Sequence, residues 1–254
     1  MFTNIRYIFL TALRDNMFYV LLLGVMGVAV IAHMLGATAP TNTRELTLSY
    51  SSSAARLMIV TGLIIFVCYH LSSAFATHEI DVFLSRPITR ANLVISYWLG
   101  FANIALLHVI ATVTLLAFQG VISWSGFAYW SLSLLLECWL AVAIALFTSF
   151  TLRGGFISVM ASMAFYILAR MMAYFIETSQ AAFGFEKPWV NYILIYALKG
   201  VSIIMPRLDF FAKTDWLSYG VRYSEDIKFF ILQAVIFIPL LILATIADFR
   251  RKQF

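Results

Sequence analysis

The chain has 254 residues, of which 63% are hydrophobic and only 11% are charged. A soluble domain is usually about 45–50% apolar and about 25% charged, and so few charges cannot cover a soluble fold of this length. The mean hydropathy of +0.92 places the whole chain among membrane proteins. The net charge of +5 comes from Lys and Arg residues scattered without a basic block, so the sequence does not favour a nucleic-acid partner.

Residues 1–16 predict an amphipathic helix that lies along the membrane interface. The apolar positions on one face are Ile5, Ile8, Phe9, Ala12 and Leu13. Such a helix buries its apolar stripe at the boundary between headgroups and acyl chains. The alternative is a signal peptide, because the pattern Ala37-Thr38-Ala39 follows the first apolar run. That run is longer than the usual signal-peptide core of about 7 to 15 residues, which favours the interfacial helix.

Six apolar runs are long enough to cross a bilayer core of about 30 Å at 1.5 Å per helical residue. They cover residues 18–35, 57–76, 97–118, 130–152, 154–176 and 229–247. Each run contains at most one ionisable side chain, and Trp or Tyr residues stand near several ends, as is typical of the membrane interface. The sequence therefore predicts an all-α polytopic membrane protein with a single transmembrane domain over residues 1–254.

A seventh apolar stretch, residues 189–205, lies between Pro188 and Pro206 and contains Lys199. We expect a re-entrant or interfacial helix there, within an outer segment of residues 177–228. Six spans then put both termini on one side. The eight Lys and Arg residues of the inner segments are more concentrated than the eight of the outer segments, so the positive-inside rule favours cytoplasmic termini.

The cytoplasmic segment between the second and third spans, residues 77–90, predicts a short amphipathic helix from Glu79 to Leu84. Its acids come first and its arginines last, an order that matches the helix dipole, and Pro87 is expected to stop the helix. The acids are Glu79 and Asp81, the arginines are Arg86 and Arg90, and the apolar strip is Ile80, Phe83 and Leu84. Such a helix suits docking into a groove of another protein, and the alternative is an ordinary solvated loop.

Two stretches carry a resemblance to a known family. Residues 84–90 (LSRPITR), followed by Leu99-Gly100, are similar to the "LLsxPisR…G" stretch of type-2 ABC exporter permeases. Residues 204–211 (IMPRLDFF), followed by residues 216–220 (WLSYG), look like the "lPnlDlF…d.l.yG" segment of the branch that includes the multicopper-enzyme-maturation permeases. The family often has Gly-Thr where Asp81-Val82-Phe83 stand, and Gly-Lys where Ser96-Tyr97 stand.

The resemblance implies a permease subunit in the inner membrane of a bacterium, with both termini cytoplasmic. It also implies that Glu79 to Leu84 is a coupling helix docked on a separate ABC ATP-binding subunit. The predicted coupling set is Glu79, Ile80, Asp81, Phe83, Leu84, Arg86 and Arg90. A second copy of the chain would complete a homodimer. The sequence contains no GxxxxGK[ST] phosphate-binding loop. We therefore expect no enzyme activity and no cofactor in this chain, with ATP and Mg²⁺ bound by the partner subunit.

Ionisable side chains inside the predicted spans are costly and are candidates for function. Glu137 and Arg170 both fall roughly 10 Å below the outer boundary, so they could form a structural ion pair or a polar element of a translocation path. His70 and His108 are either hydrogen-bonded interior histidines or ligands. The two cysteines, Cys68 and Cys138, are expected to be small buried side chains, because the chain has no metal-binding Cys/His spacing.

Three other functions compete with the transporter subunit. An ion-coupled secondary transporter usually has two similar halves with broken helices, and the sequence shows no convincing repeat. An intramembrane enzyme would need a convergent nucleophile and base, but HExxH and GxSxG are absent from the sequence. A membrane scaffold that recruits an ATPase without transport would show the same spans and cytoplasmic helix.

Overall fold

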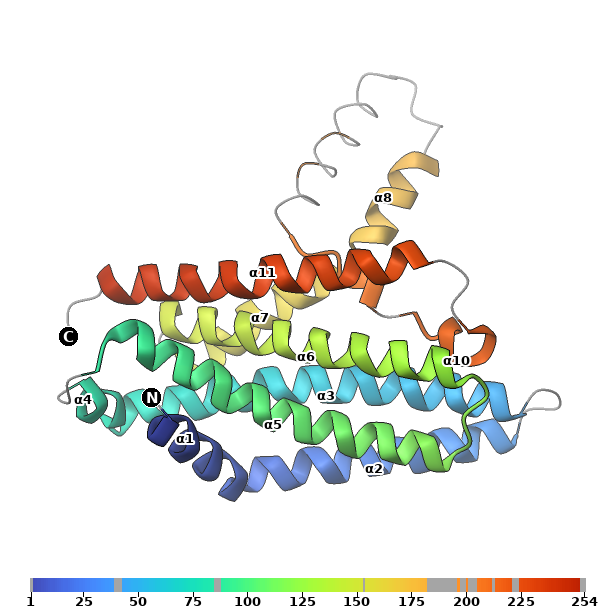
Figure 1. Cartoon of the computed structure of the whole chain (residues 1–254), viewed down its shortest axis with the longest axis horizontal. Helices are drawn as coiled ribbons and strands as arrows, with labels where there is room; N and C mark the ends of the chain where they lie inside the picture. The colour runs from blue at the N-terminus through green and yellow to red at the C-terminus, as the bar shows by residue number, and fades with distance from the viewer. Residues whose placement is uncertain are drawn as a thin grey trace.

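The computed structural model of the chain describes residues 2–38, 43–84, 88–152, 154–181, 196, 200, 205–211, 213–220 and 224–251 (Figure 1). Within these residues every regular element is a helix, which confirms the all-α prediction for that part of the chain. The elements are α1 (Phe2–Arg14), α2 (Asn16–Ala37), α3 (Thr43–Ala76), α4 (Glu79–Leu84), α5 (Arg90–Phe118), α6 (Trp124–Leu152), α7 (Gly155–Arg170), α8 (Met172–Ala181), the 3-10 helix η1 (Leu208–Phe211), α10 (Asp215–Tyr219) and α11 (Ser224–Arg251).

Five helices, α2, α3, α5, α6 and α11, are long and apolar enough to cross a membrane. The fifth predicted span, residues 154–176, is not one straight helix: α7 and α8 meet at Met171 with a bend of 45°. The pair counts as a sixth span only if it is taken as one broken crossing. The bend was not predicted because neither Pro nor Gly marks it, and hydropathy measures only apolar content.

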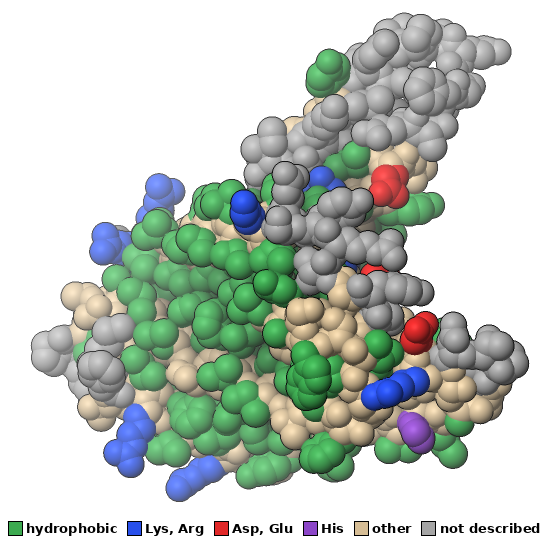
Figure 2. Space-filling model, turned by 45° about the vertical axis from the view of Figure 1, so that its right-hand side comes forward, with side chains coloured by type: hydrophobic (Ala, Val, Ile, Leu, Met, Phe, Trp, Pro, Cys, Tyr) green, Lys and Arg blue, Asp and Glu red, His purple; other side chains and the backbone are tan. Residues whose placement is uncertain are grey.

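α6 occupies the centre of the bundle. It packs against α3, α5, α7 and α11, and η1 and α10 contact it as well. α2 packs mainly on α3 and leaves much of its own surface uncovered, including Leu23, Val30 and Met34. Figure 2 shows a broad hydrophobic surface on one face of the molecule, with charged side chains mostly near its ends. Such a surface is what a bilayer core covers, so the chain has the character of a multi-pass membrane protein.

The start of α1 and the end of α11 lie at the same end of the bundle, beside α4 (Figure 1). We call this the termini end. Two residues of the predicted apolar face of α1, Ile8 and Ala12, pack into the core, with Ile8 against Gly100 of α5. The expectation that this face is buried at the membrane interface is therefore wrong for these two residues, because α5 supplies an apolar surface beside α1. Arg90, at the start of α5, donates a hydrogen bond of 2.8 Å from Nη1 to the Phe249 carbonyl oxygen near the end of α11. Because the start of α1 and the end of α11 lie at the same end, the arrangement agrees with an even number of membrane crossings between them.

α3 is much longer than predicted. It begins at Thr43, whereas the hydropathy pattern starts the second span at Leu57. Its 34 residues extend over about 51 Å, more than a bilayer core of about 30 Å requires. The additional turns are helical because their polar side chains Ser51, Ser52 and Arg56 are buried by the rest of the chain. Arg56 is therefore inside the bundle and not in an outer loop.

The chain between α8 and α11 contacts the bundle through η1 and α10. Leu208, Phe211, Trp216 and Leu217 are buried there. The predicted outer helix over residues 189–205 lies almost entirely outside the described residues, so that prediction stays untested.

Replacing Gly126 by Ala is expected to lower the free energy of unfolding by about 1 to 3 kcal/mol. A Cβ at this position of α6 would overlap the Trp216 carbonyl oxygen of α10, and backbone atoms cannot move aside as a flexible side chain can. Thermal unfolding in detergent measures the effect. The matched control is Gly27→Ala in α2, where an added Cβ meets no atom within 4 Å. An equal response of the two variants would contradict the close approach of α10.

Candidate functional site: a buried charge cluster and two cavities

Glu137 is fully buried near the middle of α6 and accepts hydrogen bonds from three side chains. Its Oε2 accepts from Arg56 Nη1 of α3 at 2.6 Å. Its Oε1 accepts from the Tyr166 hydroxyl at 2.9 Å and from Arg170 Nη1 at 2.8 Å, both in α7. We refer to Arg56, Glu137, Tyr166 and Arg170 as the charge cluster. It joins three helices through one carboxylate.

Arg56 is fully buried and its guanidinium is extensively bonded. Besides Glu137, its Nη1 donates to the Phe211 carbonyl oxygen of η1 at 2.8 Å, and its Nη2 donates to Ser133 Oγ at 3.0 Å. The guanidinium carbon also lies 4.9 Å from the centre of the Trp130 ring, within the range of a cation–π interaction. Arg56 thus links η1 to α3 and α6.

The charge cluster lies deep within the bundle. Glu137 is 15 residues from the end of α6 at Leu152, and Arg170 is 15 residues from the start of α7 at Gly155. Both distances correspond to about 22 Å along a helix axis, measured from the termini end, against a bilayer core of about 30 Å. The prediction that Glu137 and Arg170 share a depth and could pair agrees with their 2.8 Å ion pair.

The sequence interpretation missed Arg56 and Tyr166. Arg56 directly precedes the predicted second span, so the hydropathy pattern assigns it to an outer segment. A signal was present, because the buried positions Ser52, Arg56, Ile59 and Leu63 follow one another at helical spacing across that boundary. Tyr166 has no such signal in the sequence, since only the folded chain brings its hydroxyl to Glu137.

His108 and His70 lie away from the charge cluster. The two ring nitrogens of His108 are 2.9 and 3.3 Å from the carbonyl oxygens of Ile104 and Phe18. His70 Nδ1 is 3.7 Å from Asp15 Oδ2, and its ring meets Phe101 edge-on at 5.3 Å. These contacts favour interior histidines held by neighbouring groups. Among the described residues no three His, Cys, Asp or Glu side chains gather where they could hold a metal ion.

The predicted coupling helix is present as α4, from Glu79 to Leu84. Its apolar strip, however, does not face outward: Ile80 and Phe83 are buried in the chain's own core, and the Phe83 ring meets Tyr7 of α1 edge-on at 5.6 Å. The expectation that this strip docks on a partner is therefore wrong for these two residues. They are buried because α3 and α1 supply an apolar surface beside α4.

The other residues of the predicted coupling set have different places. Glu79 is half-buried, Arg90 bonds to the end of α11, and Val82 is an exposed apolar residue of α4. The side chains of Asp81 and Leu84, and Arg86 as a whole, lie outside the described part of the chain. The outward surface of α4 thus includes Val82, which the sequence did not single out.

A polar cavity of about 610 Å³ opens beside α4 at the termini end. Its ionisable lining residues are Arg14, Asp15, His70 and Glu79, which come from the α1–α2 junction, α3 and α4. Asp15 also caps α2 by accepting a hydrogen bond from the Met17 amide at 3.0 Å. The cavity therefore brings together ionisable groups of three helices and the α1–α2 junction, next to α4.

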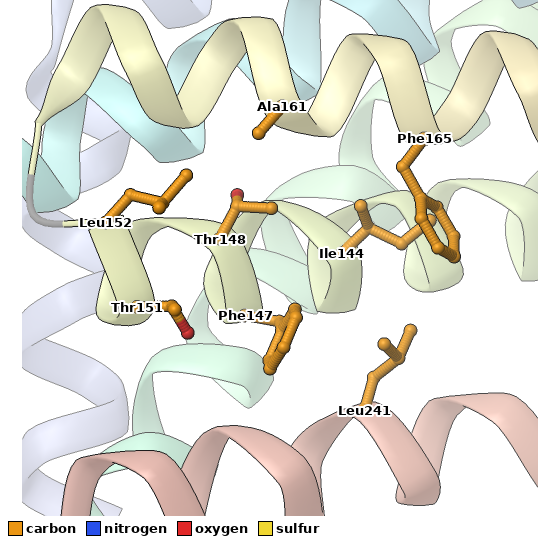
Figure 3. A pocket seen from close by; sticks show the side chains of 8 residues that line it. All are labelled: Ile144, Phe147, Thr148, Thr151, Leu152, Ala161, Phe165 and Leu241. Atoms are coloured by element: carbon orange, nitrogen blue, oxygen red, sulfur yellow. The ribbon is translucent and has the colours of Figure 1, made fainter.

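A second, almost wholly apolar cavity of about 280 Å³ lies between α6, α7 and α11. Figure 3 shows Ala161 and Phe165 of α7 facing Ile144 and Thr148 of α6, with Leu241 of α11 on the opposite wall. The Thr148 hydroxyl lies 2.6 Å from Ser162 Oγ and donates to the Ala145 carbonyl oxygen, so it adds little polarity. An engineered apolar cavity of about 150 Å³ holds benzene, so this cavity has room for an alkyl chain.

No protein-family model matches the chain, and no curated protein sequence is significantly similar to it. The geometry of the described residues alone thus identifies the candidate sites, which are the charge cluster, α4 with its polar cavity, and the apolar cavity.

Proposed function

We propose that this chain is the membrane-spanning subunit of an ATP-binding cassette transporter, driven by ATP that a separate subunit hydrolyses. The observation that carries the proposal is that one side of α4 is buried in the bundle while another side is exposed. Ile80 and Phe83 anchor it to the bundle, while Val82 is 58% exposed at the termini end. An anchored helix with an outward apolar residue suits docking of another protein. The sequence resemblance supports the same role, with the termini end facing the cytoplasm of a bacterium.

The mechanism that we propose uses α3 as a rigid connection. His78 turns the chain between α3 and α4 in a left-handed backbone conformation, with φ of 57°, and α4 packs back on α3. Arg56 lies 20 residues before the end of α3, about 30 Å along the helix. Movement of a docked ATPase would thus be transmitted through α4 and α3 to the charge cluster. Rigid-body displacement of this kind is a common means of switching between states.

We further propose that two copies of the chain form the transporter. One chain carries one docking helix, and an ATP-driven machine of this class uses two ATP-binding subunits. Cargo would then cross between the copies.

Replacing Val82 by Glu is expected to weaken association with the ATPase subunit at least tenfold, because a charge would be buried at the docking surface. The fold should be unaffected, since Val82 is exposed. Copurification from solubilised membranes, with quantification of a Walker-motif ATPase, measures the effect. Ile122→Glu, at the opposite end of the bundle and 38% exposed, is the matched control and should copurify normally. Normal association of the Val82 variant would remove α4 as the docking element.

An ion-coupled secondary transporter is the second candidate, and the bend at Met171 favours it. Such transporters often place broken helices beside their binding sites, and the 45° bend follows Arg170 of the charge cluster directly. The two candidates differ in their energy source. Uptake into vesicles that carry the purified complex should require ATP for the first candidate and an ion gradient alone for the second.

A further inference from the structure

The charge cluster contains more positive than negative charge. Arg56 and Arg170 contribute two positive charges and Glu137 contributes one negative charge, which leaves one positive charge uncompensated within the cluster. Both Nη atoms of Arg56 have acceptors, because Glu137, Phe211 and Ser133 bind them. Its Nε has no partner among the described residues, but this atom is fully buried and offers no surface to a ligand. The uncompensated charge is therefore best assigned to Arg170.

Arg170 uses only one side of its guanidinium. Its Nη1 donates to Glu137 Oε1 at 2.8 Å and to the Tyr166 hydroxyl at 3.2 Å. Its Nε and Nη2 have no acceptor among the described residues. The side chain is 24% exposed, whereas that of Glu137 is fully buried. The Nε and Nη2 edge of an arginine is a planar fork that binds a carboxylate or phosphate through two parallel hydrogen bonds.

The surroundings make an unoccupied fork unfavourable. Arg170 lies about 22 Å along α7 from the termini end, within the thickness of a bilayer core of about 30 Å. A charge at that depth is costly unless another charge or a polar group binds it. The helix ends at this residue, and α8 turns away from the bundle (Figure 1), so the next helix does not continue along the axis of α7.

We propose that the Nε and Nη2 edge of Arg170 is a binding site for an anionic group, a carboxylate or a phosphate. The bound anion balances the second guanidinium of the charge cluster, and Glu137 and Tyr166 hold Arg170 in the orientation that receives it. The anion is either the head of an amphiphile that enters from the membrane or a small anion from the aqueous phase. The site rests on the charge cluster alone and does not require the ATP-driven function.

The test measures thermal unfolding of the full chain in a neutral detergent with added anions. Decanoate and decyl phosphate represent amphiphiles, acetate and inorganic phosphate represent small anions, and decanol is the neutral control. A specific anion should raise the midpoint by roughly 5 °C or more near saturation. Arg170→Gln should abolish the rise, and Arg170→Lys should keep a smaller one, because an ammonium retains the charge without the fork.

Arg207→Gln is the matched control for surface charge. Arg207 is 25% exposed, almost the same as Arg170, but its guanidinium is paired with Asp209 at 2.9 Å. This variant should respond to anions as the unmodified chain does. A rise with decanoate and decyl phosphate alone identifies an amphiphile as the source, and a rise with acetate or inorganic phosphate as well identifies a small anion. No anion-specific rise in the unmodified chain, or an equal rise in Arg170→Gln, would overturn the proposal.

Discussion

Replacing Glu137 by Gln is expected to lower the free energy of unfolding by about 3 to 5 kcal/mol, because it leaves a fully buried arginine without its counter-charge. Arg56 would keep its hydrogen bonds to Phe211 and Ser133, but those acceptors carry no net charge. Arg170 would lose its carboxylate partner at the same time. Denaturant or thermal unfolding in detergent measures the loss.

A double-mutant cycle isolates the ion pair from the general cost of substitution. Arg56→Met and Glu137→Leu should each destabilise the chain, and the double variant should cost about 1 to 3 kcal/mol less than the sum of the two. Glu177→Gln, which alters an exposed acid of α8, is the control and should change stability by less than about 0.5 kcal/mol. Additive single effects would show that Arg56 and Glu137 do not depend on each other.

Replacing Ile80 by Asp is expected to release α4 from the bundle at a cost of about 2 to 4 kcal/mol. Ile80 is only 1% exposed, so the substitution removes an apolar side chain from the core and buries a charge. Limited proteolysis should then cut near α4 sooner than in the unmodified chain, and the thermal midpoint should fall.

The comparison with Val82→Asp separates the anchoring of α4 to the bundle from the docking of the ATPase subunit on α4. Val82 lies two residues away on the exposed side of α4, so its replacement should leave both the proteolysis pattern and the thermal midpoint unchanged. ATPase association should be lost in both variants. If Ile80→Asp left proteolysis and stability unchanged, the burial of α4 against the bundle would be contradicted.

Local signals in the sequence were sufficient for several elements. The limits of α4 agree with the prediction because the dipole-matched charge order and Pro87 depend only on neighbouring residues. Hydropathy located the cores of α2, α3, α5, α6 and α11, since a long apolar run requires no information about partners. The common depth of Glu137 and Arg170 also followed from counting residues along helices.

Features that depend on distant parts of the chain could not be predicted in this way. The start of α3 at Thr43 requires a polar helix surface to be buried, and η1 supplies part of that cover through the Phe211 carbonyl oxygen that binds Arg56. An amphipathic pattern shows that one side of a helix is buried, but it does not identify the surface that covers that side. For this reason the sequence does not reveal that Ile80 and Phe83 pack against the chain's own core. The bend at Met171 carries no local marker at all.

Site-specific photo-crosslinking at position 82 in intact membranes tests the central claim most directly. A photoreactive amino acid in place of Val82 probes the exposed side of α4 in the assembled protein, and the same residue in place of Ile122 probes the opposite end. We expect a crosslink from position 82, and not from position 122, to a subunit that contains a Walker motif. Crosslinks from position 82 to lipid alone, or to a protein without an ATP site, would contradict that claim.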